Sequence, residues 1–468
     1  MPRGDVVRVI FLGDIMTHGQ QLKYARTKDG YDFTRQFARI KPFLRKAMVV
    51  GNLETTFSGA ERKFTGFPSF NTPDELADAL VGLGVHVLTL ANNHMLDRGV
   101  SGIERTVEVL NRHGIHWTGI SDREIAPGQP LLVEYGGLRW AMVNFTYGSN
   151  SPSSGKNERG IALNVISEEG VRASVRAAKA LNPDVTVALF HWGNEYQYRP
   201  AAAQVKTAEL AAAEGADLVI GTHPHVLQPI TIIPTDRGRT LVAYSLGNFI
   251  ANQIKVPRER AAVLAVEFEK LPEGGARLMR ASVAPTFVSS SCQKGAGCTI
   301  QLLYGGKTPE PVGPEPVLPP EEVRDSSVPD EEGEQLHSLL LYDSPVAGAL
   351  AVAAVPAAAH AGEVRLDAAA GLDSSVSEVT GGTEPDAGTG EAGADGKPRK
   401  GAGSETSDAE GDGLPPLPER EIGKAISAGE KILEFLGARG DPDEYGYYTV
   451  WDASAPEELP AGNRKSPG

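Results

Sequence analysis

The chain has 468 residues, of which 41% are hydrophobic and 6% aromatic, and it carries a formal net charge of −15. This charge argues against nucleic acid as a partner, because binding phosphates requires a clustered basic surface. No window approaches the about twenty apolar residues of a membrane span, and no long apolar segment follows Met1. The sequence therefore predicts neither a membrane span nor a signal peptide, and we expect a cytoplasmic protein.

Cys292 and Cys298 are the two cysteines of the chain, and their spacing fits no zinc-binding pattern. In a cytoplasmic chain we expect them to be free thiols in a loop, with a local disulfide as the alternative.

Five short runs rich in Val, Ile and Leu predict strands that are buried on both faces. Each run ends in a cluster of polar residues. In open α/β sheets, ligands bind at the carboxyl ends of the strands, so these clusters are expected to form one site. In chain order, the runs and the polar residues after them are 6–12 with Asp14, 47–50 with Glu54, 85–90 with Asn93 and His94, 185–190 with His191, and 217–221 with His223 and His225.

Helices are predicted between these strands. Residues 72–75 have the pattern of a helix start, with Thr72 as the N-cap, and residues 101–104 form a second capping box that begins at Ser101. The patterns also predict helices at 168–181 and 201–213, a hairpin of 131–133 with 140–145, and late strands at 241–246, 261–268 and 277–284. This order favours a mixed-sheet α/β sandwich over a TIM barrel, which needs eight regular repeats.

The composition divides the chain into four parts. Residues 1–304 are the predicted catalytic domain, and residues 305–418 are so rich in Pro, Gly, Ala and acidic residues that they predict a disordered acidic linker. Residues 339–342 and 347–359 are apolar islands in this linker, with transient helices or docking segments as the alternative to disorder. Residues 419–440 contain an amphipathic helix that is expected to dock on the catalytic domain, and 441–468 form a tail.

The polar residues at the strand ends match the ligand preferences of a metal pair. Each one alone has an ordinary structural explanation, such as a turn cap or a buried core histidine. Together, nitrogen and oxygen donors without thiolates favour Mn, Fe or Zn. Two ions about 3.5–4 Å apart need a bridging carboxylate and several neutral imidazoles. The predicted metal ligands are Asp14, Glu54, Asn93, His191, His223 and His225.

The residues beside these ligands predict acid–base chemistry. A hydroxide activated by two divalent metal ions is the expected nucleophile. His94 follows the ligand Asn93 and is the predicted general acid or electrophilic partner. Asp97 lies three residues further on, where it can fix the tautomer of His94 and raise its basicity.

Six motifs resemble the CapA family, the bacterial poly-γ-glutamate capsule synthesis proteins, which are related to the calcineurin-like metallophosphoesterases. The resemblance covers about residues 6–290. It implies a four-layer α/β/β/α sandwich with two mixed sheets and a dinuclear site, with Asp14 and His225 on one metal, Asn93, His191 and His223 on the other, and Glu54 bridging. The motifs are Gly13-Asp14-Ile15-Met16, Gly51-Asn52-Leu53-Glu54, Ala91-Asn92-Asn93-His94-Met95-Leu96-Asp97-Arg98-Gly99, His191-Trp192-Gly193-Asn194-Glu195-Tyr196, Gly221-Thr222-His223-Pro224-His225-Val226 and Tyr244-Ser245-Leu246-Gly247-Asn248-Phe249.

The sequence departs from the wider phosphoesterase pattern at its first motif. That pattern has Asp-x-His, whereas Met16 stands here in the place of the histidine, so His18 is the candidate replacement ligand or a substrate contact. Tyr147 and Asn150 belong to a loop that either shapes the substrate pocket or is a plain turn.

Three further positions near the strand ends are given weaker roles. Glu195 is expected to support the site by packing and hydrogen bonding rather than to take part in it. Ser245 and Asn248 are expected to cap local structure.

The sequence therefore predicts a CapA-like, dinuclear metal-dependent hydrolase of poly-γ-glutamate or capsule polymer metabolism. Its expected substrate is an anionic small molecule or polymer, either poly-γ-glutamate-like or a phosphoester, cleaved at a phosphoester or γ-glutamyl amide bond. One alternative is a non-catalytic, metal-binding accessory protein that holds an anionic polymer during its synthesis. Another is an inert scaffold whose acidic linker is the functional part.

Overall fold

The computed structural model describes most of the predicted catalytic domain and two C-terminal segments. The predicted linker, apart from two residues, and most of the predicted helix at 419–440 lie outside the described residues. Those residues are 5–151, 157–253, 258–288, 292, 297–302, 324–325, 432–443 and 447–454.

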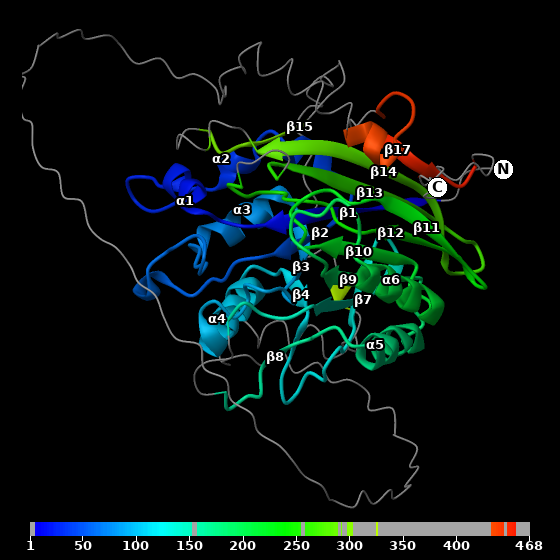
Figure 1. Cartoon of the computed structure of the whole chain (residues 1–468), viewed down its shortest axis with the longest axis horizontal. Helices are drawn as coiled ribbons and strands as arrows, with labels where there is room; N and C mark the ends of the chain where they lie inside the picture. Colours follow the sequence, from blue (N-terminus) through cyan, green and yellow to red (C-terminus); the bar gives the residue numbers. More distant parts are fainter. Residues whose placement is uncertain are drawn as a thin grey trace, which may run out of the picture. The chain divides into compact units, whose positions relative to one another are not determined.

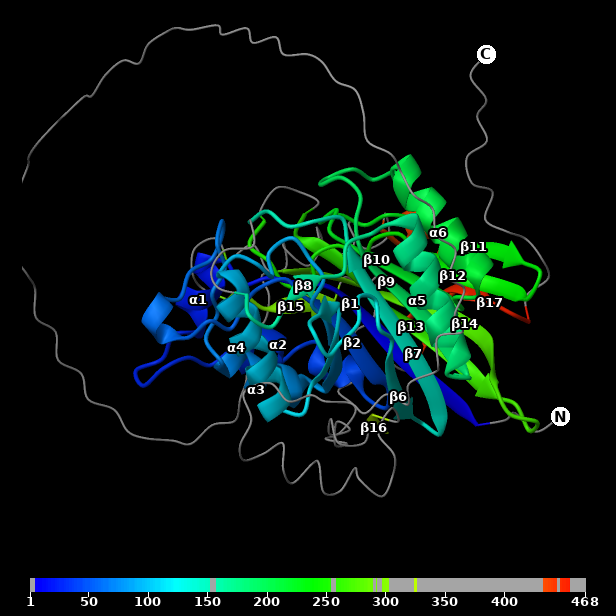
Figure 2. The same cartoon turned by 90° about the horizontal axis from the view of Figure 1, so that it is seen from below.

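Two large mixed β-sheets stack on each other (Figures 1 and 2). The order of strands in the first is β15 (Ile300–Leu302), β14 (Ala276–Val288), β13 (Arg260–Lys270), β1 (Val6–Ile15), β2 (Met48–Leu53), β3 (Val85–Thr89) and β4 (His116–Thr118), with β17 (Tyr448–Asp452) also paired to β14. The order in the second is β11 (Ile230–Thr235), β12 (Gly238–Ala243), β10 (Leu218–Thr222), β9 (Val185–His191), β7 (Leu138–Thr146), β6 (Leu131–Tyr135) and β16 (Arg324–Asp325). A separate small ribbon pairs β5 (Ile120–Ser121) with β8 (Ala162–Leu163).

Helices cover the outer faces of the two sheets (Figure 2). The apolar side chains fall into three main layers, one between the first sheet and its helices, one between the sheets, and one between the second sheet and its helices. This is the four-layer α/β/β/α sandwich that the sequence predicted. On the first sheet lie α1 (Gly19–Ala25), α2 (Thr34–Phe37), α3 (Glu75–Leu83) and α4 (Gly99–Arg112), with the short 3-10 helices Lys41–Leu44 and Ala60–Arg62 nearby, and on the second lie α5 (Glu168–Ala180) and α6 (Ala202–Glu214).

The parallel strands bring the polar ends of the sequence motifs to the same edge. In the first sheet β1, β2 and β3 are parallel, and in the second β9 and β10 are parallel. These strands are fully or almost fully buried, as their continuous apolar sequences predict.

Two predicted helix caps were wrong. Helix α3 begins after Asp74, because the hydroxyl of Thr72 is engaged with that of Thr17 at 2.8 Å. Helix α4 begins at Gly99, two residues before Ser101, because the turns after β3 run directly into it. The hydroxyl of Ser101 instead accepts a hydrogen bond from Arg62.

The prediction of free thiols was also wrong, because Cys292 and Cys298 form a disulfide. The antiparallel pairing of Val288 with Ile300 turns the chain back on itself and brings the two Cα atoms to 4.1 Å. Both cysteines are buried. A disulfide is typical of an oxidising compartment, unlike the cytoplasmic location from which free thiols were expected.

The C-terminal segments pack on the first sheet. Residues 432–436 are helical, and Ile432 and Leu436 are buried in the apolar layer between the sheets. The buried Tyr447 donates its hydroxyl to the carbonyl of Phe43 at 3.0 Å and stacks under the guanidinium of Arg8.

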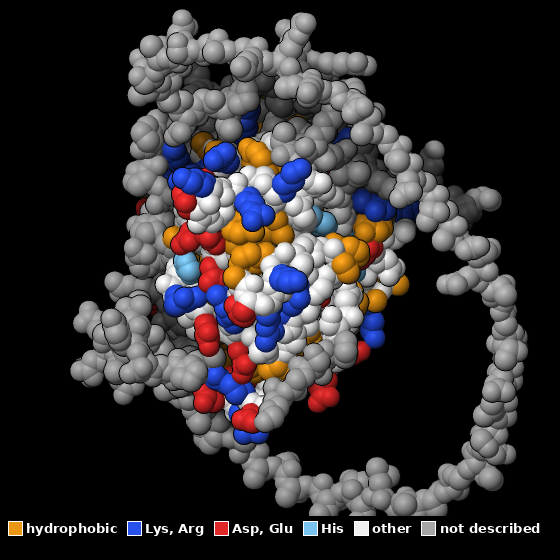
Figure 3. Space-filling view, turned by 90° about the vertical axis from the view of Figure 1, so that its left-hand side faces the viewer, with side chains coloured by type: hydrophobic (Ala, Val, Ile, Leu, Met, Phe, Trp, Pro, Cys, Tyr) orange, Lys and Arg blue, Asp and Glu red, His pale blue; other side chains and the backbone are white. Residues whose placement is uncertain are grey.

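The surface near α1 and α4 is mixed in character. Figure 3 shows the face on the left-hand side of Figure 1, where hydrophobic side chains gather at the centre and Lys, Arg, Asp and Glu side chains surround them. Within the described residues, no helix has the length and apolar composition needed to cross a bilayer.

Candidate metal centre

Glycines allow the strand ends to meet. A Cβ atom on Gly13 would lie 2.0 Å from the carbonyl oxygen of Gly247, and one on Gly221 would lie 2.1 Å from that of Tyr244. These close approaches admit no side chain. They set the ends of β1 and β10 so that Asp14 lies next to the two histidines that follow β10.

The six predicted ligands come together from five strand ends. Two overlapping groups share Glu54: one contains Asp14 and His225, the other His191 and His223, and the ligand atoms of each group lie within 4.8 Å of one another. Asn93 adjoins the second group, because its Oδ1 lies 2.9 Å from Nε2 of His191.

Glu54 lies between the two groups. Its Oε1 is 3.6 Å from Nε2 of His191 and 3.8 Å from Nε2 of His225. Its carboxylate is fully buried, and neither oxygen has a hydrogen-bond partner in the described structure. Burial, and then the negative charge of Asp14, raise the pKa of Glu54 well above its usual value. A buried carboxylate without a partner is costly unless a cation neutralises it.

A second orphaned atom points to the same conclusion. Nδ1 of His223 is buried and has no hydrogen-bond partner in the described structure. Burial and the charges of neighbouring histidines lower the pKa of His191 well below its usual value and that of His223 to about 4. Both imidazoles are therefore neutral at physiological pH, which is the form that binds metals. The donor set fits divalent metal ions.

The backbone at the two histidines after β10 is held in an unusual conformation. The φ angle is +96° at His223 and +56° at His225. Residues with side chains rarely adopt such angles, and where they do the strain is typically compensated at functional sites. Here the His225 ring lies with the carboxylates of Asp14 and Glu54, and the His223 ring lies with that of Glu54.

The tautomer of His225 is set by its neighbours. Its Nδ1 lies 2.9 Å from Oδ1 of Asn248 and 3.1 Å from Oδ2 of Asp14. The amide of Asn248 is oriented by its Nδ2, which donates to the carbonyl of Arg258 at 2.7 Å. Because both neighbours of Nδ1 accept, Nδ1 carries the proton and the lone pair of Nε2 points toward Glu54.

His94 and Asp97 form a pair beside the ligands. Nδ1 of His94 donates to Oδ2 of Asp97 at 2.8 Å, and the His94 ring meets the edge of Phe70 with centroids 4.7 Å apart. The other ring nitrogen, Nε2, lies 3.5 Å from Nδ2 of Asn150.

The predicted substrate contacts lie around the centre. The Tyr147 ring is 4.5 Å from that of His223, and its hydroxyl donates to Asn150. His18 belongs to neither ligand group. Its Nδ1 accepts a hydrogen bond from the backbone of Asn252 at 3.2 Å. Burial, and then the charges of His225 and His94, lower the pKa of His18 to about 3.

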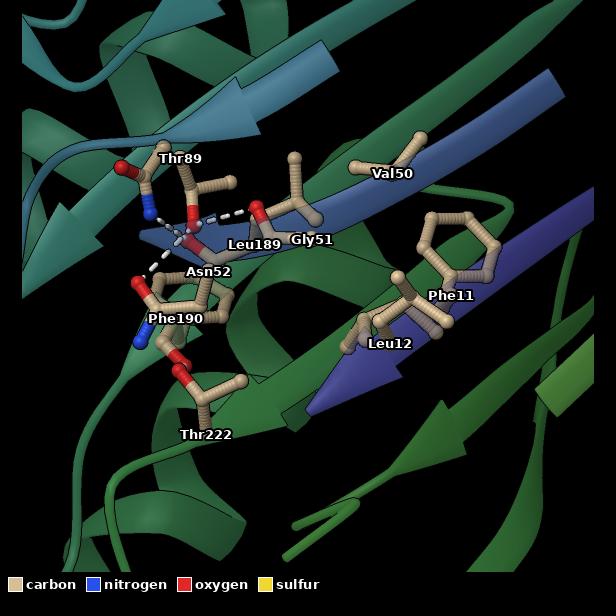
Figure 4. A pocket seen from close by; sticks show the side chains of 11 residues that line it. Phe11, Leu12, Val50, Gly51, Asn52, Thr89, Leu189, Phe190 and Thr222 are labelled. Carbon is tan, nitrogen blue, oxygen red and sulfur yellow. Dashed lines mark hydrogen bonds between the residues drawn. The ribbon is translucent and has the colours of Figure 1, made fainter. Parts of the chain in front are cut away.

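A small pocket lies beneath the centre, between the two sheets (Figure 4). Asn52, Thr89 and Thr222 form its polar end, and residues such as Phe11 and Val50 form its apolar end. It has room for about one water molecule. The pocket is therefore too small to admit a substrate, and its residues support the metal centre from below.

Comparison with known proteins identifies the family. Residues 8–253, just over half of the 468-residue chain, match the family model described as bacterial capsule synthesis protein PGA_cap. The chain belongs to the PGA_cap family. This confirms the resemblance that the motifs carried, and all six predicted ligands lie within the matched residues.

Two curated relatives in this family are similar over about half of the chain. The capsule biosynthesis protein CapA of Bacillus anthracis is 28% identical over 249 residues, which are 52% of this chain and 59% of that protein. The PGA biosynthesis protein CapA of Bacillus subtilis strain 168 is 29% identical over 256 residues, which are 53% of this chain and 64% of that protein. The chain thus spans less than two thirds of the length of either relative.

Among solved structures, the calcineurin-like phosphoesterase YfkN of Bacillus subtilis is similar at 15% identity, with a TM-score of 0.36, over 61% of this chain and 91% of that chain. That overlap identifies neither an activity nor a substrate.

Sequence reasoning missed three residues of this PGA_cap site. Asn248 orients His225 rather than only capping a turn, whereas Ser245 does bond to backbone, at Val226. Asn52 donates to Oδ1 of Asp14 at 2.8 Å. Glu195 lies within 4.8 Å of His223 and His225 and forms a third candidate ligand group with them. All three stand in the family motifs, and this was the available signal.

Proposed function

We propose that this chain is a metal-dependent hydrolase that holds two divalent ions and acts in poly-γ-glutamate or capsule polymer metabolism. The observation that supports it most is the carboxylate of Glu54, which is buried, unpartnered and within 3.8 Å of Nε2 on both His191 and His225. A carboxylate in this position is suited to bridge two ions. The names of the two CapA relatives support the polymer context.

The remaining ligands divide into two sets. Asp14 and His225 would hold one ion, and Asn93, His191 and His223 would hold the other, with Mn, Fe and Zn as the metals that suit these donors. When bound, such ions polarise the bond to be cleaved and lower the pKa of a water. Asn52 and Asn248 keep Asp14 and His225 in the orientations that binding requires.

His94 would transfer the proton to the leaving group. Its Nδ1–H is held by Asp97, so Nε2 is the nitrogen that faces the site. Protonated at Nε2, His94 can donate to the leaving oxygen or nitrogen, while the carboxylate of Asp97 stabilises the imidazolium. Tyr147 and Asn150 lie beside His223 and His94 and would shape the substrate pocket.

A second candidate function is a binding protein that holds an anionic polymer without cleaving it. Met16 favours it, because this side chain stands where the wider phosphoesterase pattern has a histidine ligand. It is buried against Phe70 and Ala251 and offers no nitrogen to a metal. A site with fewer ligands can hold one ion instead of two.

Metal stoichiometry and hydrolysis together decide between the two functions. Purified protein loaded with Mn²⁺ is expected to contain about two equivalents by elemental analysis and to cleave a model phosphodiester or a γ-glutamyl amide. Glu54→Gln keeps the shape but removes the bridging charge, so it should lose metal and activity together. About one equivalent or none, without hydrolysis of either substrate, would support the binding protein.

A further inference from the structure

Arg258 lies next to the metal centre. Its guanidinium stacks on the ring of Tyr196, with Cζ 3.2 Å from the ring centroid. The Tyr196 ring is 6.1 Å from that of His225, and its backbone N–H donates at 2.7 Å to the carbonyl of Pro224, which lies between the two histidines that follow β10. One side of the Arg258 guanidinium is thus positioned against a wall of the site.

The backbone of Arg258 is also linked to the candidate ligand His225, through Asn248. Its carbonyl accepts a hydrogen bond of 2.7 Å from Nδ2 of Asn248, and Oδ1 of Asn248 lies 2.9 Å from Nδ1 of His225. One amide therefore orients a candidate metal ligand and holds the arginine in place. The backbone of Arg258 is held through Asn248 and its guanidinium through Tyr196, and both of these residues lie against His225.

The guanidinium of Arg258 is available for a ligand, unlike those of several other arginines of the chain. Arg62 and Arg98 donate to backbone carbonyls and hydroxyls, and Arg260 pairs with Glu259 at 3.2 Å. In the part of the chain that the structure describes, no carboxylate lies within ion-pair distance of Arg258. A guanidinium stacked on an aromatic ring keeps its N–H groups in the plane of the fork, where they can bind an oxyanion with two parallel hydrogen bonds.

The acidic side chains of the site favour a cationic side chain of the protein as the group that binds an anionic substrate. The carboxylates of Asp14, Glu54 and Glu195 all belong to the candidate ligand groups, so acidic side chains gather around the place where a substrate would bind. Glu195 in particular lies beside the histidines and opposes the entry of an anion. A substrate with acidic groups therefore needs a cation of the protein as well as the metal ions.

We propose that Arg258 binds an oxyanion of the substrate. This oxyanion is a carboxylate or phosphate group next to the bond that is cleaved at the metal centre. The site is thereby selective for polyanionic substrates over neutral ones. This inference rests on the proposed function for the cleavage, but the binding it describes is independent of hydrolysis. Arg258 is a specificity residue of the site.

Calorimetric titration of the Mn²⁺-loaded protein tests this directly. The probes are a γ-linked glutamate tetramer, its methyl ester, and inorganic tripolyphosphate, so that the carboxylate and phosphate sources are distinguished. Arg258→Gln should weaken the binding of at least one anionic probe by about 10-fold to 100-fold, the loss expected for a charged hydrogen-bonded pair. Arg258→Lys should lie between that variant and the wild type, because lysine cannot form the bidentate fork.

Two further variants separate recognition from general effects. Arg260→Gln removes the same charge two residues away, from an arginine paired with Glu259, and should bind within about twofold of the wild type. Tyr196→Leu keeps every charge near Arg258 but removes its platform, and should weaken anion binding several-fold. Metal content and thermal unfolding of each variant establish that it is folded and loaded.

The possible results have distinct meanings. The proposed role of Arg258 would be rejected by any of three results. These are equal affinities of the wild type and Arg258→Gln for the anionic probes, an equal loss of affinity in Arg260→Gln, or no binding of either anionic probe to the wild type. If only Arg258→Gln loses affinity, in a protein that holds one metal and hydrolyses nothing, the role of Arg258 would be supported and the hydrolase rejected. If the protein hydrolyses its substrate and Arg258→Gln binds the probes as tightly as the wild type, the hydrolase would be supported and the role of Arg258 rejected.

Discussion

Nδ1 of His94 lies 2.8 Å from Oδ2 of Asp97, and the same carboxylate oxygen accepts a hydrogen bond of 2.8 Å from the backbone N–H of Phe70. The carboxylate is therefore held by a backbone group and in turn holds the imidazole. Since Asp97 accepts at Nδ1, the free nitrogen of His94 is Nε2, on the side of Asn150. This arrangement is suited to proton transfer at Nε2.

Replacing His94 tests its role as the proton donor. His94→Ala is expected to lower kcat for hydrolysis by about 100-fold or more, because the leaving group then departs without a proton. Asp97→Asn should lower it by about 10-fold to 100-fold, since the ring loses its orientation. Rates measured with a substrate whose leaving group needs no protonation should change much less. Full activity of His94→Ala, at unchanged metal content, would remove His94 from this role.

The contact between Asn248 and His225 predicts a specific loss of metal affinity. Asn248→Ala removes one of the two acceptors at Nδ1 of His225 and leaves only Asp14, which is itself a candidate ligand, so the tautomer and orientation of the ring are held less firmly. We expect Mn²⁺ binding to weaken by about 10-fold to 100-fold. Ser245→Ala is the matched control, because Ser245 lies three residues away and bonds to the backbone of Val226. Equal metal affinities of the two variants would show that Asn248 only supports the loop.

His86 predicts a pH dependence of stability away from the metal centre. Its Nδ1 accepts from the backbone of Val49 at 3.1 Å, and burial, with a smaller contribution from the charge of His116, lowers its pKa to about 4. The unfolded chain takes up this proton near pH 6.5, whereas the folded chain resists it. His86 therefore contributes full stability above about pH 6.5, and roughly 3 kcal/mol of it is lost as the pH falls toward 4.

Urea unfolding of the metal-free protein at several pH values measures this effect. His86→Asn retains an acceptor for Val49 but has no proton to gain, so its free energy of unfolding should fall less steeply than that of the wild type between pH 6.5 and 4. The buried histidines of the metal centre titrate in both proteins and cancel in the comparison. Parallel curves would contradict the lowered pKa.

The disulfide gives a chemical prediction. Unfolded, unreduced protein should show no free thiol to an alkylating reagent, and reduced protein should show two, because Cys292 and Cys298 are the two cysteines of the chain. The cysteines are six residues apart, so the closed loop is short and removing the bond should lower the free energy of unfolding by about 2 kcal/mol. Two thiols in the unreduced protein would contradict the disulfide.

The strand ends show how much of the site can be predicted from local sequence. An apolar run followed by a polar cluster marks both a buried strand and its carboxyl end, and parallel strands place such ends at one edge. Asp14, Glu54 and His191 could be assigned to one site for this reason, and the structure brings them together. The helix starts at α3 and α4 were missed because Thr72 and Ser101 bond to distant groups instead of to their own helices.

The sequence by itself determined the sandwich, the family and the six candidate ligands. Hydrophobic periodicity and sequence motifs depend on residues that are close together in the chain, so they can be recognised without the structure. The tertiary structure alone decided which groups support those ligands: Asn248 at His225, Asn52 at Asp14, and Arg258 on Tyr196. It also decided the disulfide, which depends on a strand pairing. Partners in these contacts lie up to tens of residues apart, and ångström-scale distances between such residues arise only when the chain packs.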